Sequence, residues 1–427
     1  MVDRVDVAEV HLWGQQIGAV AWNESRRLAT FEYHPAFLRS SLEPAPLTMP
    51  LGTGLFQFPQ LAFETYRGLP GLLADSLPDR FGNDLIDAWL ARQGRDRATF
   101  SPVERLCYIG SRGMGALEYH PAHRGRSASA PIHVDQLVDL AKKMLSARGG
   151  LQVDLDDEGL TELLRVGTSA GGARAKAIVA WNPKTDEVRS GQVPAPDGFE
   201  YWILKFDGVG SFDRKFADPE GYGRIEYAYH LMARDAGLVV SRSRLFIDQR
   251  GRAHFMTRRF DRSDDGDKFH SQTLAAMAHL DFNEAGAHSY EQALATTLQI
   301  CGAVDLDQMF RRMVFNVVSR NQDDHTKNIT FVMDRSGLWH LSPAYDVTWA
   351  YNPSGRWTSR HQMTIGGKRD EVTRSNLLTV AQKYGIRTPE SVIDQVVASV
   401  ADWKHYASEA EVEDEHRDRI SPTHRLL

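Results

Sequence analysis

Cysteine is nearly absent from this sequence, since Cys107 and Cys301 are the two thiols in 427 residues. Two distant thiols supply neither a disulfide framework nor a cluster of metal-binding thiolates, and this scarcity is typical of a reducing compartment. The first residues, MVDRVDVAEVHLWG, carry acidic side chains and no apolar core segment, so they do not resemble a secretory signal. No apolar run approaches the roughly 18 residues that a membrane span requires. We therefore expect a cytoplasmic protein.

The sequence also lacks an excess of positive charge. Its 50 Lys and Arg against 56 Asp and Glu give a formal charge of −6, which provides no general attraction to nucleic acid or anionic membranes. Arginines gather at 258–262 and 311–320, where the pattern fits either a solvated face or a local basic patch. No H-E-x-x-H or H-x-x-x-H pair is present, which argues against a zinc hydrolase of that type.

What is present is an ordinary globular composition, with 42% hydrophobic and 25% charged residues, in a chain long enough for two or three packed units. Short alternating runs at 5–33 predict a small antiparallel sheet, and 69–93 has helical spacing that Pro78 and Gly82 are expected to interrupt. The predicted order is an accessory αβ subdomain, a Pro- and Ser-rich linker, a β-rich lobe and a helical lobe, at 1–120, 121–135, 136–262 and 263–427.

Several elements of the two lobes can be predicted individually. A helix is expected from Val134 towards Ser146, and another from about Gly223 that closes at Gly237. The segments AIVAW, EYWILKFDG, SRLFID and AHFMTRRF are predicted strands. A strand-rich lobe followed by a helical lobe favours a ligand cleft between them.

The strongest chemical signal is the segment SRNQDDHTKN at 319–328, which lies between an amphipathic helix and a strand. Asp323 and Asn328 are five positions apart, and Asp346 follows after a predicted hairpin. Phosphoryl transfer needs these residue types: the first Asp orients a hydroxyl and accepts its proton, while Asn and the second Asp offer oxygens to Mg²⁺. The spacing matches that of a protein-kinase catalytic loop. A polar loop with capping Asp and Asn is the alternative interpretation.

Further candidates fit a nucleotide site. Lys205 lies in an apolar strand and needs an anionic partner, which Glu226 on the following helix can supply, as in the kinase ion pair that holds ATP phosphates. The alternative is a lysine on an edge strand that points to water. The segment GTSAGGARAK at 167–176 is rich in small residues that let main-chain N–H groups approach phosphates, although a plain flexible turn has the same composition. His325 and Lys327 flank the catalytic positions; His325 either holds the loop by hydrogen bonds or transfers a proton.

The segments NQDDHTKN and LSPAYDV together resemble the catalytic stretch of the HipA family of serine/threonine kinases, the toxins of type II toxin–antitoxin systems. TSAGGARAK resembles the glycine-rich loop of that family, ILKFDG and RIEYAYHLMARDAGL its nucleotide-lysine strand and following helix, and RRFDR the segment between its lobes. GLPGLLADSLPDRFGNDLI and RGMGALEYHPA resemble its N-terminal subdomain. The resemblance covers nearly the whole chain, and it implies an α+β, bilobal, protein-kinase-like fold.

The resemblance also implies roles for individual residues. Asp323 would be the catalytic Asp, and Asn328 and Asp346 would hold Mg²⁺. The nucleotide ATP would be contacted by the residues Lys205, Glu226, Gly171, Gly172, Ala173, Arg258, Phe260, His325 and Lys327. Ser169 would be the site of autophosphorylation. Members of the family typically phosphorylate an aminoacyl-tRNA synthetase and are bound by a helix-turn-helix antitoxin of the HipB type, so contact with DNA would be indirect.

Two other functions fit the same residues. A small-molecule phosphotransferase would keep the fold and place an acidic acceptor pocket in the helical lobe. An inactive kinase-like scaffold would bind an antitoxin and DNA as a co-repressor, but the presence together of Lys205, Asp323, Asn328 and Asp346 argues against lost catalysis.

Overall fold

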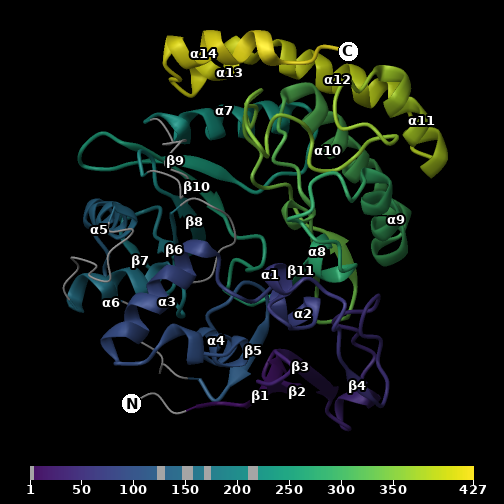
Figure 1. Cartoon of the computed structure of the whole chain (residues 1–427). Coiled ribbons are helices and arrows are strands. Elements are labelled where there is room, and N and C mark those ends of the chain that lie inside the picture. Colours follow the sequence, from purple (N-terminus) through teal and green to yellow (C-terminus); the bar gives the residue numbers. More distant parts are fainter. Residues whose placement is uncertain (1–3, 123–129, 147–156, 168–174, 210–219) are drawn as a thin grey trace. The chain divides into compact units, whose positions relative to one another are not determined.

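The structure is a computed structural model that describes residues 4–122, 130–146, 157–167, 175–209 and 220–427 (Figure 1). The chain forms two compact units. The first contains 1–45, 49–223 and 244–271, and the second contains 46–48, 224–243 and 272–427. Ser169, Gly171, Gly172 and Ala173 lie outside the described residues, so their expected roles stay predictions. The four-part division expected from the sequence likewise stays a prediction.

The first sheet of the first unit begins with the antiparallel strands predicted from the alternating runs. Its order is β4-β3-β2-β1-β5, with bounds β1 Val7–Leu12, β2 Gln15–Asn23, β3 Leu28–Tyr33, β4 Leu55–Phe56 and β5 Leu117–His120. Strand β1 alternates exposed and buried residues, as expected for a strand with one face on a core. Trp13 and Gly14 both have positive φ in the two-residue connection from β1 to β2, a geometry that matches the twist of a hairpin.

Four helices lie between β4 and β5 in the chain: α1 Phe63–Tyr66, α2 Gly71–Ala74, α3 Arg80–Arg92 and α4 Pro102–Ile109. The expected interruption at Gly82 is wrong, because α3 runs through it. Asp79 caps the helix by accepting from the Gly82 N–H at 2.7 Å, so Gly82 is held in the first turn. Helix α4 begins with a capping box in which Ser101 and Glu104 bond each other's main-chain N–H groups.

The second sheet of the first unit has the order β7-β6-β8-β10-β9, and α5 and α6 precede it in the chain (Figure 1). The bounds are α5 Val134–Ser146, α6 Asp157–Val166, β6 Lys176–Trp181, β7 Val188–Ser190, β8 Glu200–Lys205, β9 Ser243–Ile247 and β10 Ala253–Arg258. Phe81 and Leu85 of α3 share one buried cluster with Leu137 of α5, Leu163 of α6 and Trp202 of β8. One core therefore serves both an N-terminal helix and the second sheet.

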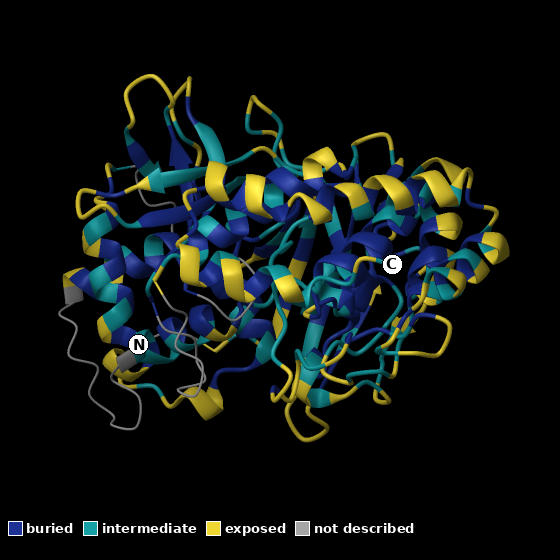
Figure 2. Cartoon of the chain, turned by 90° about the horizontal axis from the view of Figure 1, so that it is seen from above, coloured by how far each residue is buried: buried dark blue, intermediate teal, exposed yellow. Residues whose placement is uncertain are grey.

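The second unit is mainly helical, as predicted for the chain beyond Ser271. Its helices are α7 Tyr222–Asp235, α8 Leu274–Met277, α9 Tyr290–Cys301, α10 Leu306–Ser319, α11 Arg374–Tyr384, α12 Pro389–Ala401, α13 Trp403–Glu409 and α14 Asp414–Ile420. A small sheet contains β11 His270–Thr273, β12 Thr330–Met333 and β13 Trp339–Leu341. Figure 2 shows helices with exposed residues on one side and buried residues on the other. Among the described residues, no helix combines the length and apolar character needed to cross a bilayer.

His270 makes the stability of the first unit sensitive to acid. Its ring is fully buried, and its Nε2 lies 3.1 Å from the Pro44 main-chain oxygen. Burial lowers the pKa of His270 to about 4, against a smaller opposing effect of the Pro44 bond. Below its usual pKa of about 6.5 the unfolded chain binds a proton that the folded chain refuses, so stability falls as pH decreases from 6.5 towards 4. At pH 5 the loss through this residue is about 2 kcal/mol.

We expect His270→Gln to lose about 2 kcal/mol less than the wild type between pH 7 and pH 5 in urea unfolding. His405→Gln is the control, because it makes the same substitution at a largely exposed ring. An identical loss in His270→Gln and the wild type would contradict the prediction.

Candidate active site

The predicted catalytic segment is a loop between α10 and β12. Helix α10 ends where Arg320 adopts the left-handed conformation, with φ of 60°. The Arg320 N–H donates to the Asn316 main-chain oxygen and so caps the last turn of the helix. The Arg320 guanidinium then donates to the Thr423 main-chain oxygen at 3.0 Å and lies 3.3 Å from an Asp370 oxygen. The loop closes with a 3₁₀ turn at Thr326–Asn328, in which the Asn328 N–H donates to the His325 carbonyl. The start and the end of the loop are thus both anchored.

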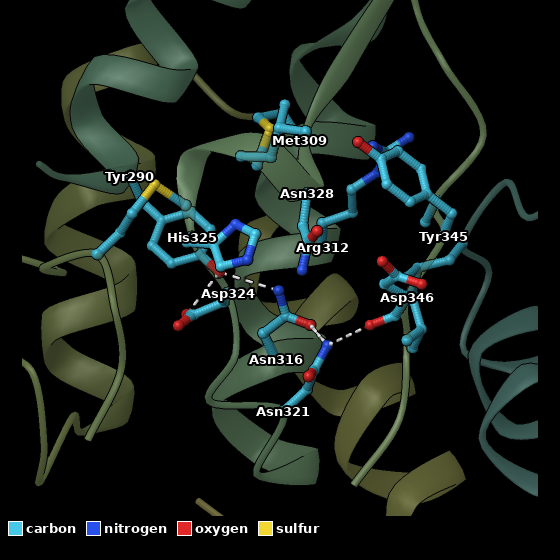
Figure 3. A pocket seen from close by; sticks show the side chains of 15 residues that line it. Tyr290, Met309, Arg312, Asn316, Asn321, Asp324, His325, Asn328, Tyr345 and Asp346 are labelled. Atoms are coloured by element: carbon cyan, nitrogen blue, oxygen red, sulfur yellow. Dashed lines mark hydrogen bonds between the residues drawn. The ribbon is translucent and has the colours of Figure 1, made fainter. Parts of the chain in front are cut away.

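Asn328 and Asp346 line one pocket of the second unit, although 17 residues separate them in the sequence. In Figure 3 both side chains project into this pocket, Asn328 from the loop and Asp346 from the segment after β13. The Tyr345 hydroxyl donates to the Lys327 main-chain oxygen at 2.7 Å and so joins the two segments beside these residues. The proximity of Asn328 and Asp346 that the sequence predicts is therefore present.

Asp323 lies at the turn of the loop, and its side chain is 53% exposed. Asn328 Nδ2 donates to the Asp323 main-chain oxygen at 2.8 Å, which fixes the peptide at this position. The His325 Nε2 atom lies 3.9 Å from Asp323 Oδ1, too far for a hydrogen bond. The main chain of Asp323 is thus fixed by a hydrogen bond, while its carboxylate is accessible to a substrate hydroxyl.

His325 lines the pocket, and its ring lies 5.7 Å from that of Phe282. Its Nδ1 atom has no hydrogen-bond partner among the described residues, so the expected loop-holding bond of the imidazole is not seen at that atom. The His325 main-chain oxygen instead accepts a hydrogen bond from the Asn328 N–H, which closes the loop. The Lys327 Nζ atom lies over the Phe282 ring, 5.1 Å from the ring centroid.

Sequence reasoning missed a buried polar cluster behind the loop. Asp324 is 2% exposed, and its carboxylate accepts hydrogen bonds from the Tyr290 hydroxyl at 2.8 Å and from the Gln362 N–H at 2.7 Å. His361 Nδ1 lies 2.7 Å from the same carboxylate. Burial, and next the Asp324 charge, raise the pKa of Tyr290 well above its ordinary value, so its hydroxyl stays a donor. The sequence contains only a weak signal for this cluster, because Tyr290 and His361 are far from the loop along the chain.

Arg312 also lines the pocket, from α10. Its guanidinium donates to the Ser342 main-chain oxygen, and burial lowers its pKa to about 10. At neutral pH it is therefore a buried cation in the wall of the pocket.

The remaining described candidates are not among the residues that line this pocket. Lys205 is the last residue of β8, half-buried on the same strand face as Ile203, and its Nζ lies 5.7 Å from the Phe255 ring centroid. Glu226 is buried in α7. Lys205 belongs to the first unit and Glu226 to the second, and their ion pair stays a prediction. Arg258, at the end of β10, pairs with Asp264, and the half-buried Phe260 follows it.

The residues present fit Mg²⁺ bound together with a nucleotide. Asn328 uses its amide nitrogen in a hydrogen bond to the loop, so its amide oxygen is the atom that would act as a metal ligand, and the Asp346 carboxylate lines the same pocket. Within the described ranges, no group of three or more His, Cys, Asp or Glu residues is arranged to hold a metal ion. Mg²⁺ usually takes one or two protein oxygens and completes its shell with phosphates and water. One oxygen each from Asn328 and Asp346 would match this way of binding Mg²⁺.

Comparisons with known proteins agree with the sequence motifs. Residues 168–404 match the family described as HipA-like C-terminal domain, and residues 8–120 match the HipA N-terminal domain. No curated protein sequence matches the chain.

The solved structures that match this chain include two proteins of known identity. One is HipA in a complex of the Shewanella oneidensis MR-1 toxin–antitoxin proteins HipA and HipB with operator DNA. It has 16% sequence identity and a TM-score of 0.68, covering 97% of this chain and 94% of that one. The other is the Helicobacter pylori proinflammatory kinase CtkA, with 12% identity and a TM-score of 0.34, covering 52% of this chain and 90% of that one. The first similarity confirms the predicted HipA-like α+β fold. Because one family model alone spans more than half of the sequence, the chain belongs to the HipA family.

Proposed function

We propose that this protein is an ATP- and Mg²⁺-dependent serine/threonine kinase that acts as the toxin of a toxin–antitoxin pair. The observation that carries the proposal is the shared pocket of Asn328 and Asp346, with Asn328 also bonded to the main chain of Asp323. Family membership supports it, since both HipA domains match. Mg²⁺ bound to Asn328 and Asp346 would offset the charge of the ATP phosphates.

Each remaining candidate has a place in this proposal. Asp323 orients the acceptor hydroxyl and takes its proton, and its exposure suits a substrate as large as a protein. Lys205, supported by Glu226, holds the nucleotide phosphates, and the small residues at 171–173 approach them from the glycine-rich loop. Arg258 and Phe260 contact adenine, and His325 and Lys327 lie beside the nucleotide. Ser169 is the proposed autophosphorylation site.

The proposed partners follow from the family. The similar Shewanella protein was solved with HipB and operator DNA, which supports an antitoxin of the HipB type for this chain and only indirect contact with DNA. An aminoacyl-tRNA synthetase is the proposed substrate, on the resemblance of the motifs alone.

The proposal is tested by incubating the purified protein with radiolabelled ATP, Mg²⁺ and a lysate of the source cells. We expect labelled protein bands, including a band from self-labelling at Ser169. Mass spectrometry identifies the proteins in these bands. Asp346→Asn should abolish labelling because it removes the charged metal ligand. Asp402→Asn, at an exposed aspartate of the same unit, should not. Absence of Mg²⁺-dependent transfer from the wild type would refute the kinase proposal, and label on small molecules alone would refute the protein substrate.

A further inference from the structure

A continuous row of hydrogen bonds joins the catalytic loop to the main chain of Asp346 through residues outside the proposed chemistry (Figure 3). The Tyr290 hydroxyl donates to Asp324 at 2.8 Å and accepts from Asn316 Nδ2 at 2.9 Å. Asn321 Nδ2 donates to Asn316 Oδ1 at 2.9 Å and lies 3.4 Å from the Asp346 main-chain oxygen. The row begins one residue after Asp323 and ends at Asp346.

The direction of each bond is fixed by chemistry. The Tyr290 hydroxyl donates to Asp324 Oδ2, which acts as the acceptor. The tyrosine oxygen then accepts from the Asn316 amide nitrogen, which turns the Asn316 amide oxygen towards Asn321. These bonds fix which way each amide and the hydroxyl are turned, and hydrogen bonds linked in this way strengthen one another. The Asn321 amide oxygen is buried and makes no hydrogen bond within the described residues.

The end of the row lies at a point that needs support. Asp346 has φ of 50°, in the left-handed region that a residue other than glycine adopts only where its surroundings hold it. Helix α10 supplies Asn316 near its end, and Asn321 follows the left-handed residue Arg320 that closes the helix. The first residue of α9, Tyr290, is fixed by its own N–H, which donates to the Thr364 main-chain oxygen. Tyr290, Asn316 and Asn321 all line the same pocket as Asp346.

We propose that Tyr290, Asn316 and Asn321 are positioning residues that set the conformation of Asp346 relative to the catalytic loop, and so determine how well Mg²⁺ is held with the nucleotide. The inference rests on the proposed function, because Asp346 is a metal ligand only if that function holds. Although all three line the pocket, their proposed role is to hold the main chain of Asp346 through hydrogen bonds and not to bind Mg²⁺ or ATP. Loss of groups that orient a metal ligand typically weakens metal affinity or activity about 10- to 100-fold.

The test measures binding without chemistry. A non-hydrolysable ATP analogue, AMP-PNP, is titrated calorimetrically into the full chain at increasing Mg²⁺ concentrations. For Asn321→Ala we expect the Mg²⁺ concentration that half-restores tight binding to rise by about 10-fold or more. Tyr290→Phe keeps the ring and removes only the hydroxyl, so it should show a rise in the same direction if Asn321→Ala does not fold. Binding of AMP-PNP without Mg²⁺ should be unchanged in both.

Tyr406→Phe is the matched control. This tyrosine is buried in the same unit, and its hydroxyl contacts Ser399 and Asp235 rather than the row. A merely structural role for Tyr290 would lower the melting temperature of both tyrosine variants and leave the Mg²⁺ dependence of both at the wild-type value. That result, with a wild type that binds AMP-PNP in a Mg²⁺-dependent way, would overturn the inference alone. A wild type without Mg²⁺-dependent binding would overturn the proposed function and this inference together.

Discussion

Replacing Asp323 with asparagine is expected to lower the rate of phosphoryl transfer about 10³-fold, within the range that general base catalysis contributes. The variant keeps the size and shape of the side chain but cannot accept the proton of the acceptor hydroxyl. Nucleotide binding should persist, because Asn328 contacts the main-chain oxygen of Asp323, which the substitution leaves in place. The measurement is single-turnover transfer from labelled ATP, alongside calorimetric binding of AMP-PNP.

Asp402→Asn serves as the control here as well, since it changes one exposed aspartate of the same unit to the same residue. Wild-type transfer by Asp323→Asn would remove Asp323 from its proposed role. If Asp323→Asn lost both AMP-PNP binding and phosphoryl transfer, Asp323 would instead be assigned to nucleotide or metal binding. The two measurements therefore separate a base from a ligand.

Local patterns predicted much of the fold. The helix expected from Val134 towards Ser146 has those bounds, and the alternation at 5–33 gives β1, β2 and β3. These elements follow from the period of their apolar residues, which burial against one core enforces. Gly82 was misjudged because the cap from Asp79 offsets the low helix propensity of glycine in the first turn.

The candidate site was predictable only where its residues share a short motif. Asp323 and Asn328 have a recognisable spacing, and the proximity of Asn328 to Asp346 followed from the hairpin between them. Tyr290 and Asn316 carry no such signal. Tyr290 reaches the loop because α9 packs on α10, and Asn316 looks like one polar interruption in the apolar run VFNVV. Contacts between distant segments depend on tertiary packing, which no local period encodes.

The segment 259–262 of the first unit contains a largely buried ion cluster. Asp261 accepts from Arg259 Nε at 2.8 Å and Nη2 at 2.7 Å, and from Arg262 Nη1 at 2.7 Å. The Gly115 N–H donates to the same carboxylate at 2.7 Å, and both arginines also donate to main-chain oxygens at 113–115. The cluster thus fastens the N-terminal region to the segment that contains Phe260.

Burial alone would raise the pKa of Asp261, but the charges of Arg259 and Arg262 outweigh it and hold that pKa well below its ordinary range. A carboxyl whose pKa is depressed by folding stabilises the folded state above its unfolded pKa of about 3.9. This stabilisation is lost as pH falls below that value, and it is complete at neutral pH.

We expect Asp261→Ala to lower the free energy of unfolding at pH 7 by about 3–5 kcal/mol, because two buried guanidinium groups lose their counter-charge. Asp264→Ala is the matched control. Asp264 lies three residues after Asp261 and pairs with Arg258, but its side chain is 84% exposed, so the loss should stay within about 1 kcal/mol. Urea unfolding of both variants provides the measurement. Equal, small losses would show that the cluster at 261 is not what fastens the N-terminal region, whereas a large loss confined to Asp261→Ala would mean that this region and the segment around Phe260 unfold as one.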